Sequence, residues 1–507
     1  MNATSSESSA PGAFLRHGLL LFLAVLALSL PQAALLPLLD RDEPRFAEAS
    51  REMFQSGNFI VPTFNHAPRY AKPPLIYWCQ AVSYTLFGEN AFSARLPSLL
   101  ATAGTALILL AWGIQLGDKN IGLIAALSYA FCLQTMQQGR VATADALLIF
   151  FMTLTAFAGW KLIVSPPASP SFRSYLWDTI LALGFAGGFL AKGPEALLPL
   201  LPLLICARGM RSSLTPELIG NFVIGLALVL FWAIPAYIET HGDYWRVGMS
   251  EGVGERMVTG LQGHGASTLG WYLLSLPLYL LLFWLSALPW SPLLVRKKLF
   301  TEWKPDLADT YLLWNAGLIF VVFSLMVTKL PHYTLPAFPF LALVFARRWI
   351  SSGLRPALPI KLAAGFGIAL ALLTAVLVPI AIANHATPSP VGELVRDADG
   401  LLKPDTQFAL VDFQEPNAIW EMRRVTKAYG QPIPEAEVLP FLNQPGPHAV
   451  VLTSSFAQRI LDTARSDSDP GWKIFEARGF NAAKINIHAP YYLPIPEPLD
   501  IILVIKP

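Results

Sequence analysis

Charged residues are scarce in this chain. Of its 507 residues, only 14% are Asp, Glu, Lys or Arg, whereas 54% are hydrophobic. A soluble domain usually carries about 25% charged residues. The composition therefore excludes an ordinary soluble domain and indicates an integral membrane protein. The formal net charge of +2 is too small to suggest a nucleic-acid partner.

Cofactor motifs are also missing. The three cysteines, Cys79, Cys132 and Cys206, are scattered in apolar sequence without a pairing pattern or a zinc-type spacing. No glycine-rich phosphate loop is present either, so the sequence offers no visible nucleotide site. We therefore expect no bound cofactor.

Long apolar runs are abundant up to residue 384. They lie at 18–39, 91–116, 121–138, 146–164, 176–207, 217–238, 269–293, 311–327, 333–346 and 360–384. Most approach the roughly 20 residues that cross a bilayer as a helix, and the run at 176–207 is interrupted at Lys192-Gly193-Pro194. The first run is long for a secretory signal and further spans follow it, so we expect an uncleaved helix. The sequence predicts a polytopic α-helical membrane protein with about eleven spans, within a range of about 11 to 13.

Basic residues mark one side of these spans. If the N-terminus is cytoplasmic, every strongly basic short loop also lies on the cytoplasmic side, as in most membrane proteins. These basic residues are Lys119, Lys161, Arg173, Arg208, Arg211, Arg296, Lys297, Lys298, Lys304, Arg347, Arg348, Arg355 and Lys361. The region after residue 384 then lies on the outer side.

The character of the sequence changes after residue 384. Strand-like segments at 407–413, 448–454 and 500–507 alternate with helix-like segments at 416–430 and 455–465. We expect a membrane domain over residues 1–384 and a soluble α/β domain over residues 385–507. His448 and His488 are isolated in this domain, and we expect no chemical role for either.

A charged insert follows the first apolar run, within a first outer loop at 40–90. Its charged residues are Asp40, Asp42, Glu43, Arg45, Glu48, Arg51 and Glu52. Residues 44–54 predict a helix with Phe46, Ala49, Met53 and Phe54 on one face. Because the charges lie on the opposite face, this helix is predicted to lie in the membrane interface. The alternative is a helix whose charged face meets water.

Carboxylates at membrane boundaries are the candidates for acid–base chemistry. Asp42 and Glu43 are adjacent and precede Arg45, an arrangement that suits a general base or a group that holds an acceptor. The alternative is a salt bridge at headgroup level. Asp145 lies at the outer end of the fourth span, where it needs a partner or a polar cavity, and Arg140 is a nearby candidate partner.

Basic and phenolic side chains at the same boundary suggest a phosphate site. Lys72 precedes Pro73-Pro74, which hold its backbone extended, and Lys329 stands shortly before Tyr333. Lys192, at the Gly193-Pro194 break in the apolar run, is a less specific candidate for the phosphate site. Together they predict phosphate binding, although a boundary lysine alone more often extends to lipid headgroups.

The outer loop at 239–268 is glycine-rich and carries Arg256 and His264. Such loops commonly act as lids over a site. A lone histidine is more often a surface group than a metal ligand, so His264 is only a loop candidate.

Several blocks of sequence together resemble a known family. They are DEPRFAEASREMFQSGNFIVP, RYAKPPLIYW, FLAKGPEALLP, GHGAST leading through WYLL to LPW, and SLMVTKLPHYTLPAFP. In consistent order over roughly residues 18–350 they look like the bacterial glycosyltransferases of the protein mannosyltransferase type. They are most similar to the enzymes that transfer 4-amino-4-deoxy-L-arabinose from undecaprenyl phosphate to lipid A.

The resemblance implies a GT-C fold and an inverting transfer of a sugar from a polyprenyl-phosphate donor. It places the protein in a bacterial inner membrane with its C-terminal domain in the periplasm. The acceptor would be lipid A, another glycolipid or a protein of the envelope. The resemblance implies that Asp42 is the catalytic or acceptor-orienting acid, with Glu43 and Arg45 beside it.

The resemblance also implies further roles at the site. Lys72, Lys329 and Tyr333 would hold the lipid phosphate, and Asp145 would be a second acid. In the mechanism we expect, Arg256 also helps to stabilise the leaving phosphate. One position departs from the family, because Ala71 stands where the aminoarabinose transferases have a glutamate. If that glutamate forms a metal site together with a histidine such as His264, the site in this chain lacks one of its ligands. We therefore expect no required metal, although a divalent ion is compatible with the fold.

Two alternative functions remain. A protein O-mannosyltransferase-like enzyme would use another acceptor, and the sequence does not choose between acceptors. A transporter or flippase for a lipid-linked sugar would also have many spans. Transporters place ionisable residues near the middle of the membrane, whereas here they gather at one boundary, which favours the enzyme.

Overall fold

The structure, a computed structural model, describes residues 11–39, 41–164, 172–210, 214–250, 268–384, 389–411, 415–453, 471–486 and 495–507. The chain forms two compact units, each of which combines segments that are distant in the sequence. The helical unit comprises Met1–Leu30, Tyr70–Ile76 and Pro97–Leu372. The α/β unit comprises Pro31–Arg69, Tyr77–Leu96 and Leu373–Pro507.

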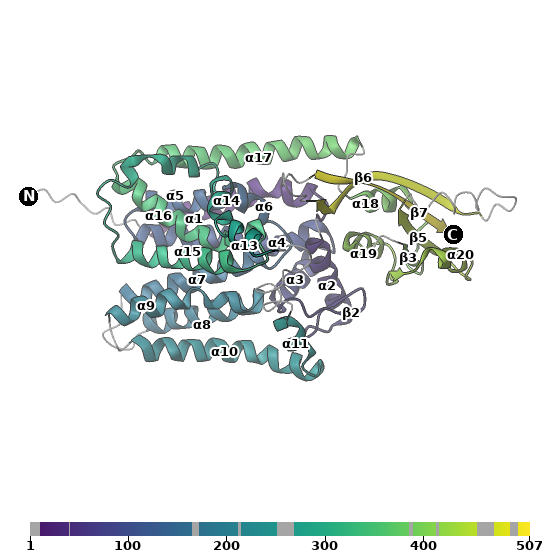
Figure 1. Cartoon of the computed structure of the whole chain (residues 1–507), viewed down its shortest axis with the longest axis horizontal. Helices are drawn as coiled ribbons and strands as arrows, with labels where there is room; N and C mark the ends of the chain where they lie inside the picture. The colour runs from purple at the N-terminus through teal and green to yellow at the C-terminus, as the bar shows by residue number, and fades with distance from the viewer. Residues whose placement is uncertain are drawn as a thin grey trace, which may run out of the picture. The chain divides into compact units, whose positions relative to one another are not determined.

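Helices make up the first unit (Figure 1), and three of them extend into the α/β unit at residues 31–35, 91–96 and 373–383. They are α1 (Pro11–Leu35), α4 (Ala91–Gln115), α5 (Lys119–Ala130), α6 (Leu133–Gln138), α7 (Asp145–Val164), α8 (Phe172–Lys192), α9 (Leu200–Met210), α10 (Leu214–Glu239), α11 (Asp243–Met249), α13 (Leu269–Ser275), α14 (Leu278–Ser286), α15 (Leu307–Leu325), α16 (Phe338–Ser351) and α17 (Ala357–Ala383). Short 3₁₀ turns lie at η1 (Pro194–Leu197), η4 (Ser291–Val295), η5 (Lys297–Leu299) and η6 (Pro331–Ala337). Among the described residues, seven helical segments are long and apolar enough to cross a membrane. The predicted class of a polytopic helical membrane protein is confirmed.

The helical unit is held together by aromatic packing and close helix contacts. Helix α8 packs between α7 and α10, and α16 packs between α5 and α15. Trp160 stacks on Tyr311 with ring centroids 5.7 Å apart, and the Tyr311 hydroxyl donates to the Ala156 carbonyl at 2.9 Å. A Cβ atom at Gly113 would lie 2.4 Å from the backbone of Gly122. Only glycine therefore permits this contact between α4 and α5.

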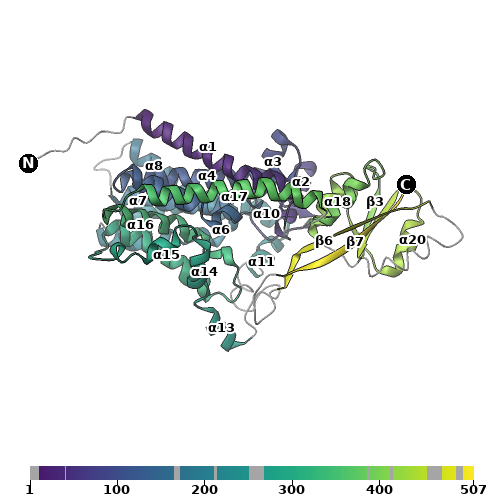
Figure 2. The same ribbon diagram turned by 90° about the horizontal axis from the view of Figure 1, so that it is seen from above.

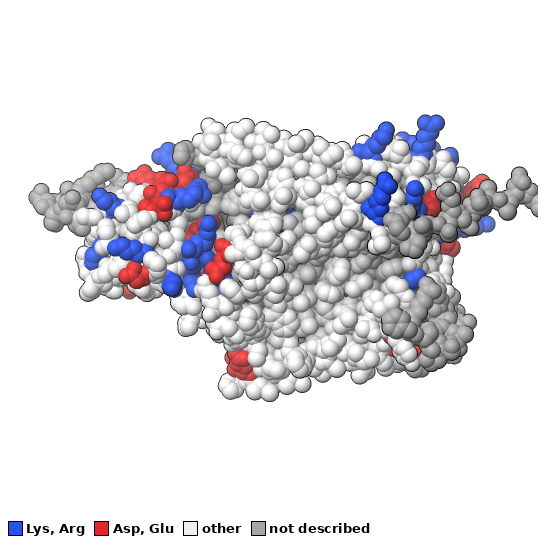
Figure 3. Space-filling view, turned by 180° about the vertical axis from the view of Figure 1, so that it is seen from behind, with Lys and Arg blue, Asp and Glu red and all other residues white. Residues whose placement is uncertain are grey.

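Charged side chains are distributed unevenly over this unit. On the face drawn in Figure 3, Lys and Arg gather at one end of the helices, and a broad band over their middle carries no charged side chains. This distribution suits helices whose middle lies in hydrocarbon.

The interrupted apolar run breaks where the sequence predicts. Helix α8 ends at Lys192, and Gly193 follows with a φ of 96°, a conformation that favours glycine. Pro194 then begins η1. The break places Lys192 at a helix end.

A five-stranded sheet forms the centre of the α/β unit (Figure 2). Its strands are β3 (Gln407–Val411), β4 (Gln431–Pro432), β5 (His448–Thr453), β6 (Lys473–Asn486) and β7 (Ile495–Lys506). The order is β4-β3-β5-β7-β6. Strands β4, β3 and β5 are parallel, and β7 is antiparallel to both β5 and β6. The strands predicted around 407, 448 and 500 are confirmed.

Helices cover both faces of this sheet. Helices α18 (Pro390–Asp397) and α19 (Pro416–Arg423) pack on the face that carries Phe408 and Leu410. The short α20 (Val438–Leu442) packs on the face that carries Ala409 and Val411. This alternation is the period of two expected for a strand that is buried on both sides.

Two predicted elements of this unit differ from the structure. The helix predicted at 416–430 ends at Arg423, and Gly430 stands directly before β4 instead of closing the helix. A Cβ atom on Gly430 would lie 2.5 Å from the Ile419 side chain, so the glycine allows close packing rather than ending a helix. The helix predicted at 455–465 lies outside the described residues.

The charged insert forms helix α2 (Asp42–Ser56) of the α/β unit, followed by β1 (Thr63–Phe64), β2 (Ala67–Pro68) and α3 (Leu75–Phe87). The predicted helix is confirmed, but both expected surroundings of its charged face are wrong. Glu48 and Arg51 are fully buried and Glu52 is 2% exposed. The charged residues in the middle of α2 therefore meet neither water nor lipid headgroups.

Residues of α19 explain this burial. The Arg423 guanidinium contacts Glu48 and lies 3.2 Å from Glu52. Arg51 donates to Glu48 and, at 2.9 Å, to the Trp420 carbonyl. Buried charges persist when they are paired and hydrogen-bonded. The first outer loop and the C-terminal segment therefore fold together as one unit.

Candidate active site

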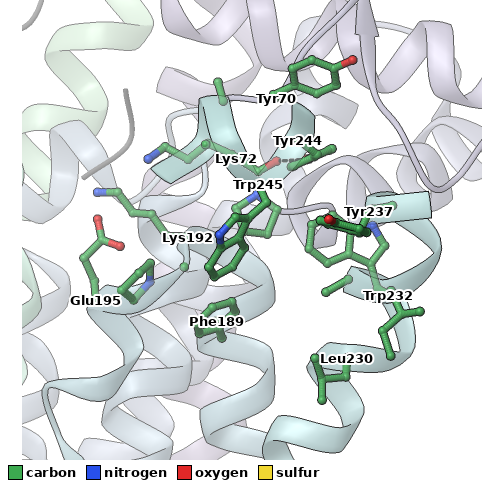
Figure 4. A pocket seen from close by; sticks show the side chains of 18 residues that line it. Tyr70, Lys72, Phe189, Lys192, Glu195, Leu230, Trp232, Tyr237, Tyr244 and Trp245 are labelled. Atoms are coloured by element: carbon green, nitrogen blue, oxygen red, sulfur yellow. Dashed lines mark hydrogen bonds between the residues drawn. The ribbon is translucent and has the colours of Figure 1, made fainter. Parts of the chain in front are cut away.

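A cavity of about 300 Å³ lies in the helical unit and has one polar and one apolar end. Figure 4 shows the side-chain ends of Lys72, Lys192 and Glu195 gathered on one side of it. Apolar and aromatic side chains line the other side in Figure 4, and they are Phe189, Leu230, Trp232, Tyr237 and Trp245. Ala233, Ile234 and Ala236 also line the cavity. The cavity thus suits an amphiphile with an anionic head and an apolar chain.

The backbone of Lys72 is anchored to α11. The Tyr244 hydroxyl donates to the Lys72 carbonyl at 2.5 Å, which is the dashed contact in Figure 4. The Tyr244 ring also lies 5.2 Å from the ring of Tyr70 and 5.2 Å from that of Trp232. Because the following Pro73 restricts the same backbone, the Lys72 side chain leaves from a fixed point toward the cavity.

Lys192 and Asp145 form a buried ion pair with an Nζ to Oδ1 distance of 2.6 Å. The other carboxylate oxygen accepts from the Thr143 hydroxyl at 2.9 Å. The Lys192 ammonium also lies 5.3 Å from the centre of the Tyr333 ring, within the range of a cation–π contact. The suggestion of Arg140 as the ion-pair partner of Asp145 is wrong, because the break after α8 directs Lys192 to the carboxylate.

Lys329 lies apart from the residues that line this cavity. Its ammonium donates to the carbonyls of Ser324 and Met326 at 2.6 and 2.5 Å, and it lies 5.4 Å from the Tyr272 ring. These carbonyls belong to the end of α15, where a cation is favoured. Burial lowers the pKa of Lys329 below its usual value. An anion beside it would raise the pKa again.

The adjacent carboxylates of α2 occupy different surroundings in the α/β unit. Asp42 has a side chain that is 55% exposed and lies 4.0 Å from the Arg45 guanidinium. Burial lowers the pKa of Arg45, and the nearby Arg69 adds to this effect. Glu43 is enclosed and binds Arg95 through both carboxylate oxygens at 2.7 and 2.6 Å. The geometry of Glu43 favours a structural salt bridge, and Asp42 is the accessible carboxylate of the two.

Two of the predicted site residues lie outside the described part of the chain, and the described part shows no cluster of metal ligands. Arg256 and His264 fall in residues 251–267, which the structure does not describe. In the described part of the chain, no three His, Cys, Asp or Glu side chains gather as a metal site would require. Ala71, which lines the cavity, has no ligand atom.

Some residues of the cavity were not singled out from the sequence. Glu195 follows Lys192 within the KGPE segment, but this position alone does not indicate that both line one cavity. Tyr244 and Trp245 stand together in the first turn of α11, and aromatic residues in such segments commonly meet the membrane surface. Only the tertiary structure brings them to Lys72.

Comparison with known proteins identifies the fold and the relatives. A family model described as dolichyl-phosphate-mannose-protein mannosyltransferase matches residues 71–237. The undecaprenyl phosphate-alpha-4-amino-4-deoxy-L-arabinose arabinosyl transferase of Shewanella sediminis is 32% identical over 61% of this chain and 56% of its own length. The enzyme of the same description from Edwardsiella ictaluri is 31% identical over 60% of this chain and 54% of its own length.

A solved structure agrees over nearly the full length. The crystal structure of ArnT from Cupriavidus metallidurans bound to undecaprenyl phosphate is 16% identical and has a TM-score of 0.72, covering 98% of each chain. The chain is similar in sequence to the aminoarabinose transferases over about 60% of its length and has the GT-C fold. The resemblance drawn from the motifs is thereby confirmed. In sequence, the chain spans little more than half the length of the curated relatives that it matches.

Proposed function

We propose that this protein is an inverting membrane glycosyltransferase that moves a sugar from a polyprenyl-phosphate donor to an envelope acceptor. The observation that supports this most is the cavity in which Lys72 and Lys192 meet an apolar lining. The names of the relatives, which are arabinosyl transferases that use undecaprenyl phosphate, supply the reaction class.

The phosphate of the donor would bind at the polar end of the cavity, and its isoprenoid chain would bind at the apolar end. The lysine ammonium groups hold the phosphate, because a compact cation suits a phosphate oxygen. Phe189, Leu230 and Trp232 contact the first part of the isoprenoid chain. Lys329 and Tyr333 remain candidates for the same phosphate, as the resemblance implies.

The transfer would be a single displacement at the anomeric carbon. An acceptor oxygen forms the new bond to this carbon, while the bond to the phosphate oxygen breaks and polyprenyl phosphate leaves with the electron pair. Lys72 and Lys192 stabilise the charge that grows on this phosphate, an effect that is worth about a hundredfold or more in rate per donor.

The acceptor decides whether a base is needed. A hydroxyl acceptor must lose its proton, and we propose the exposed carboxylate of Asp42 as the group that takes it. An acceptor phosphate is already ionised, and Asp42 then orients it. Glu43 keeps its structural pair with Arg95 in either case.

Asp42→Asn should abolish transfer while folding and donor binding remain. The assay uses the full chain in vesicles with a polyprenyl phosphosugar and measures the released polyprenyl phosphate. Asp399→Asn, at another exposed carboxylate of the same unit, is the matched control and should stay active. Full activity of Asp42→Asn would remove the proposed base. A failure of the wild-type protein to release polyprenyl phosphate would remove the proposed enzyme and favour a transporter or flippase.

The acceptor is proposed to be lipid A or another glycolipid, because the sequence blocks resemble those of enzymes that transfer aminoarabinose to lipid A. The family model over residues 71–237 supports a protein acceptor as the second candidate. Mass spectrometry of lipid A and of envelope proteins, from cells with and without this chain, separates the two. A mass shift of lipid A alone supports the first candidate, and shifted envelope proteins support the second.

We also propose the orientation within the bacterial inner membrane. The N-terminus and the basic loops would be cytoplasmic, and the α/β domain at 385–507 would be periplasmic, with the membrane domain at 1–384. The support is the positive charge of alternate loops. In a chain whose native cysteines are replaced, a membrane-impermeant thiol reagent should label Lys403→Cys but not Lys298→Cys in intact spheroplasts. The reverse labelling would overturn this orientation.

A further inference from the structure

A second cavity, of about 400 Å³, lies in the helical unit between α14, α15, α16 and the η4–η5 segment. Its lining is apolar and aromatic and includes Phe283, Trp290 and Phe320. Arg348 is the one charged residue among those that line it. Neither the proposed reaction nor the donor site uses this cavity.

The cavity is elongated along two helices. Leu313, Gly317 and Phe320 line it from α15, and Leu341, Phe345 and Arg348 line it from α16. Each set covers about two helical turns, which corresponds to about 10 Å along the helix axis. An apolar cavity of this length suits an extended hydrocarbon chain.

Arg348 lies where the cavity meets a cluster of cations. Its guanidinium donates to the Leu299 carbonyl at 2.9 Å and lies 5.2 Å from the Trp303 ring. Both Leu299 and Trp303 also line the cavity. Tryptophan at such a position is favoured at headgroup depth.

The cluster, which we call the basic rim, consists of Arg296, Lys297, Lys298, Arg348 and Arg355. Contacts around the end of α16 hold it together. The Arg296 guanidinium lies 5.4 Å from the Trp349 ring, whose Nε1 donates to the Arg355 carbonyl at 2.9 Å. The Ser352 hydroxyl donates to the Lys298 carbonyl at 3.1 Å.

The acids near this cluster do not cancel its charge. Asp306 and Asp309 are paired with Arg347, which is not part of the rim. Glu302 is one exposed acid beside the five cations of the rim. The rim is therefore a site of net positive charge directly beside an apolar cavity.

We propose that this cavity binds one acyl chain of an anionic diacyl phospholipid and that the basic rim holds its headgroup phosphate. The complementarity is twofold, because the apolar lining matches the chain and the cations match the anion. Basic pockets between membrane helices commonly bind anionic headgroups.

The position along α15 distinguishes this lipid from the polyprenyl donor. Helix α15 has 19 residues and is about 28 Å long, close to the hydrocarbon thickness of about 30 Å. The basic rim lies near its first turn, where Arg347 binds Asp306 and Asp309. At its other end, Phe323 of the last turn contacts Tyr333, and the Tyr333 ring lies 5.3 Å from the Lys192 ammonium of the donor cavity. The two sites therefore contact opposite leaflets, and a lipid bound at the rim is not placed to react.

The first test fills the cavity. A Cβ atom at Gly317 meets no atom within 4 Å, so the side chain of Gly317→Leu enters the open space. The substitution also replaces glycine inside a helix, which favours folding. Gly365 of α17 is likewise exposed with no atom within 4 Å of a Cβ, so Gly365→Leu is the matched control.

The measurement is native mass spectrometry of the full chain in detergent with added phosphatidylglycerol or phosphatidylcholine. We expect one phosphatidylglycerol bound at least about tenfold more tightly than phosphatidylcholine. Gly317→Leu should lose this binding and Gly365→Leu should keep it. Unchanged phosphatidylglycerol binding in Gly317→Leu would overturn the proposal, and so would equal affinity of the wild type for the two lipids.

The second test removes the headgroup contacts. Lys297→Gln with Lys298→Gln should reduce the preference for phosphatidylglycerol, while Arg478→Gln, at an 86% exposed side chain of the α/β unit, should not. Equal loss in both variants would indicate general charge attraction and would overturn the role of the rim. Displacement of phosphatidylglycerol by polyprenyl phosphate at equal concentration would assign the cavity to the donor instead.

Discussion

Both units contain buried ion pairs, but the surroundings of these pairs differ between the two units. In the helical unit, Lys192 pairs with Asp145 and also lines a cavity. In the α/β unit, Glu43 and Arg95 are enclosed, and Arg95 donates three further bonds to carbonyls of residues 33–37. A pair that borders a cavity can exchange its partner for an incoming anion, whereas an enclosed pair cannot. On the proposed function, this difference would separate a pair that binds an anion from a structural pair.

The same contrast separates two neighbouring residues. Asp42 and Glu43 are adjacent, yet the side chain of Asp42 is 55% exposed and that of Glu43 is 2% exposed. They lie at the start of one helix, where successive residues point in different directions. Adjacency in the sequence therefore does not imply shared surroundings, and of these two carboxylates only that of Asp42 is exposed.

Arg95→Met should cause the largest loss of stability. The substitution leaves the Glu43 carboxylate buried without its bidentate partner and removes the bonds to the connection between α1 and α2. Breaking one partner of a buried pair costs about 3 to 5 kcal/mol. Thermal and denaturant unfolding of the full chain in detergent measure the change.

Arg424→Gln is the control for this comparison. Arg424 pairs with Glu421, but its side chain is 50% exposed, and exposed pairs contribute about 0 to 1 kcal/mol. Equal stabilities of Arg95→Met and Arg424→Gln would show that enclosure does not distinguish the pairs, and the comparison between the units would fail.

Lys192→Gln should lower both stability and transfer, because it leaves Asp145 unpaired and removes a cation from the cavity. Adding Asp145→Asn makes the pair neutral and should restore most of the stability. Transfer should remain about a hundredfold below the wild type, because the phosphate still lacks its cation. The released polyprenyl phosphate and the unfolding midpoint are measured on the same samples. Recovery of both in the double variant would make this pair purely structural.

Local patterns were enough to predict much of the fold. Apolar runs predicted the multi-pass class, and the Gly193-Pro194 break predicted the end of a helix at Lys192. Strands β3, β5 and β7 followed from short β-rich segments. These features depend on neighbouring residues, which a single sequence displays directly.

The partners of the charged residues could not be predicted in the same way. Arg423 contacts Glu48 across 375 positions of the chain, and no local signal marks such a pair. The charged face of the helix at 44–54 was therefore predicted to meet water or lipid headgroups, whereas its charged residues in fact pair with a residue of helix α19. The partner of Asp145 was sought nearby, at Arg140, although the cation comes from a different helix. Long-range pairing is the information that periodicity lacks.

An exposed ion pair completes the comparison and should show the smallest effect. Asp306 and Arg347 lie 2.7 Å apart, with the Asp306 side chain 57% exposed. The hydrogen bond from Arg347 lowers the pKa of Asp306. A carboxyl whose folded pKa is lowered adds stability above its unfolded pKa, about 3.9, and this stability is lost as the pH falls through the folded value.

Asp306→Asn should therefore destabilise the chain by at most about 1 kcal/mol near neutral pH. Asparagine still caps α15, because its side-chain oxygen can accept from the Asp309 backbone as Asp306 does at 2.8 Å. The gap in melting temperature between wild type and variant should shrink as the pH is lowered from about 6 toward the folded pKa. A gap that stays constant over this range would mean that the charge of Asp306 contributes nothing. A gap as large as that of Arg95→Met would show that exposure to water does not weaken a pair, against the comparison drawn between the two units.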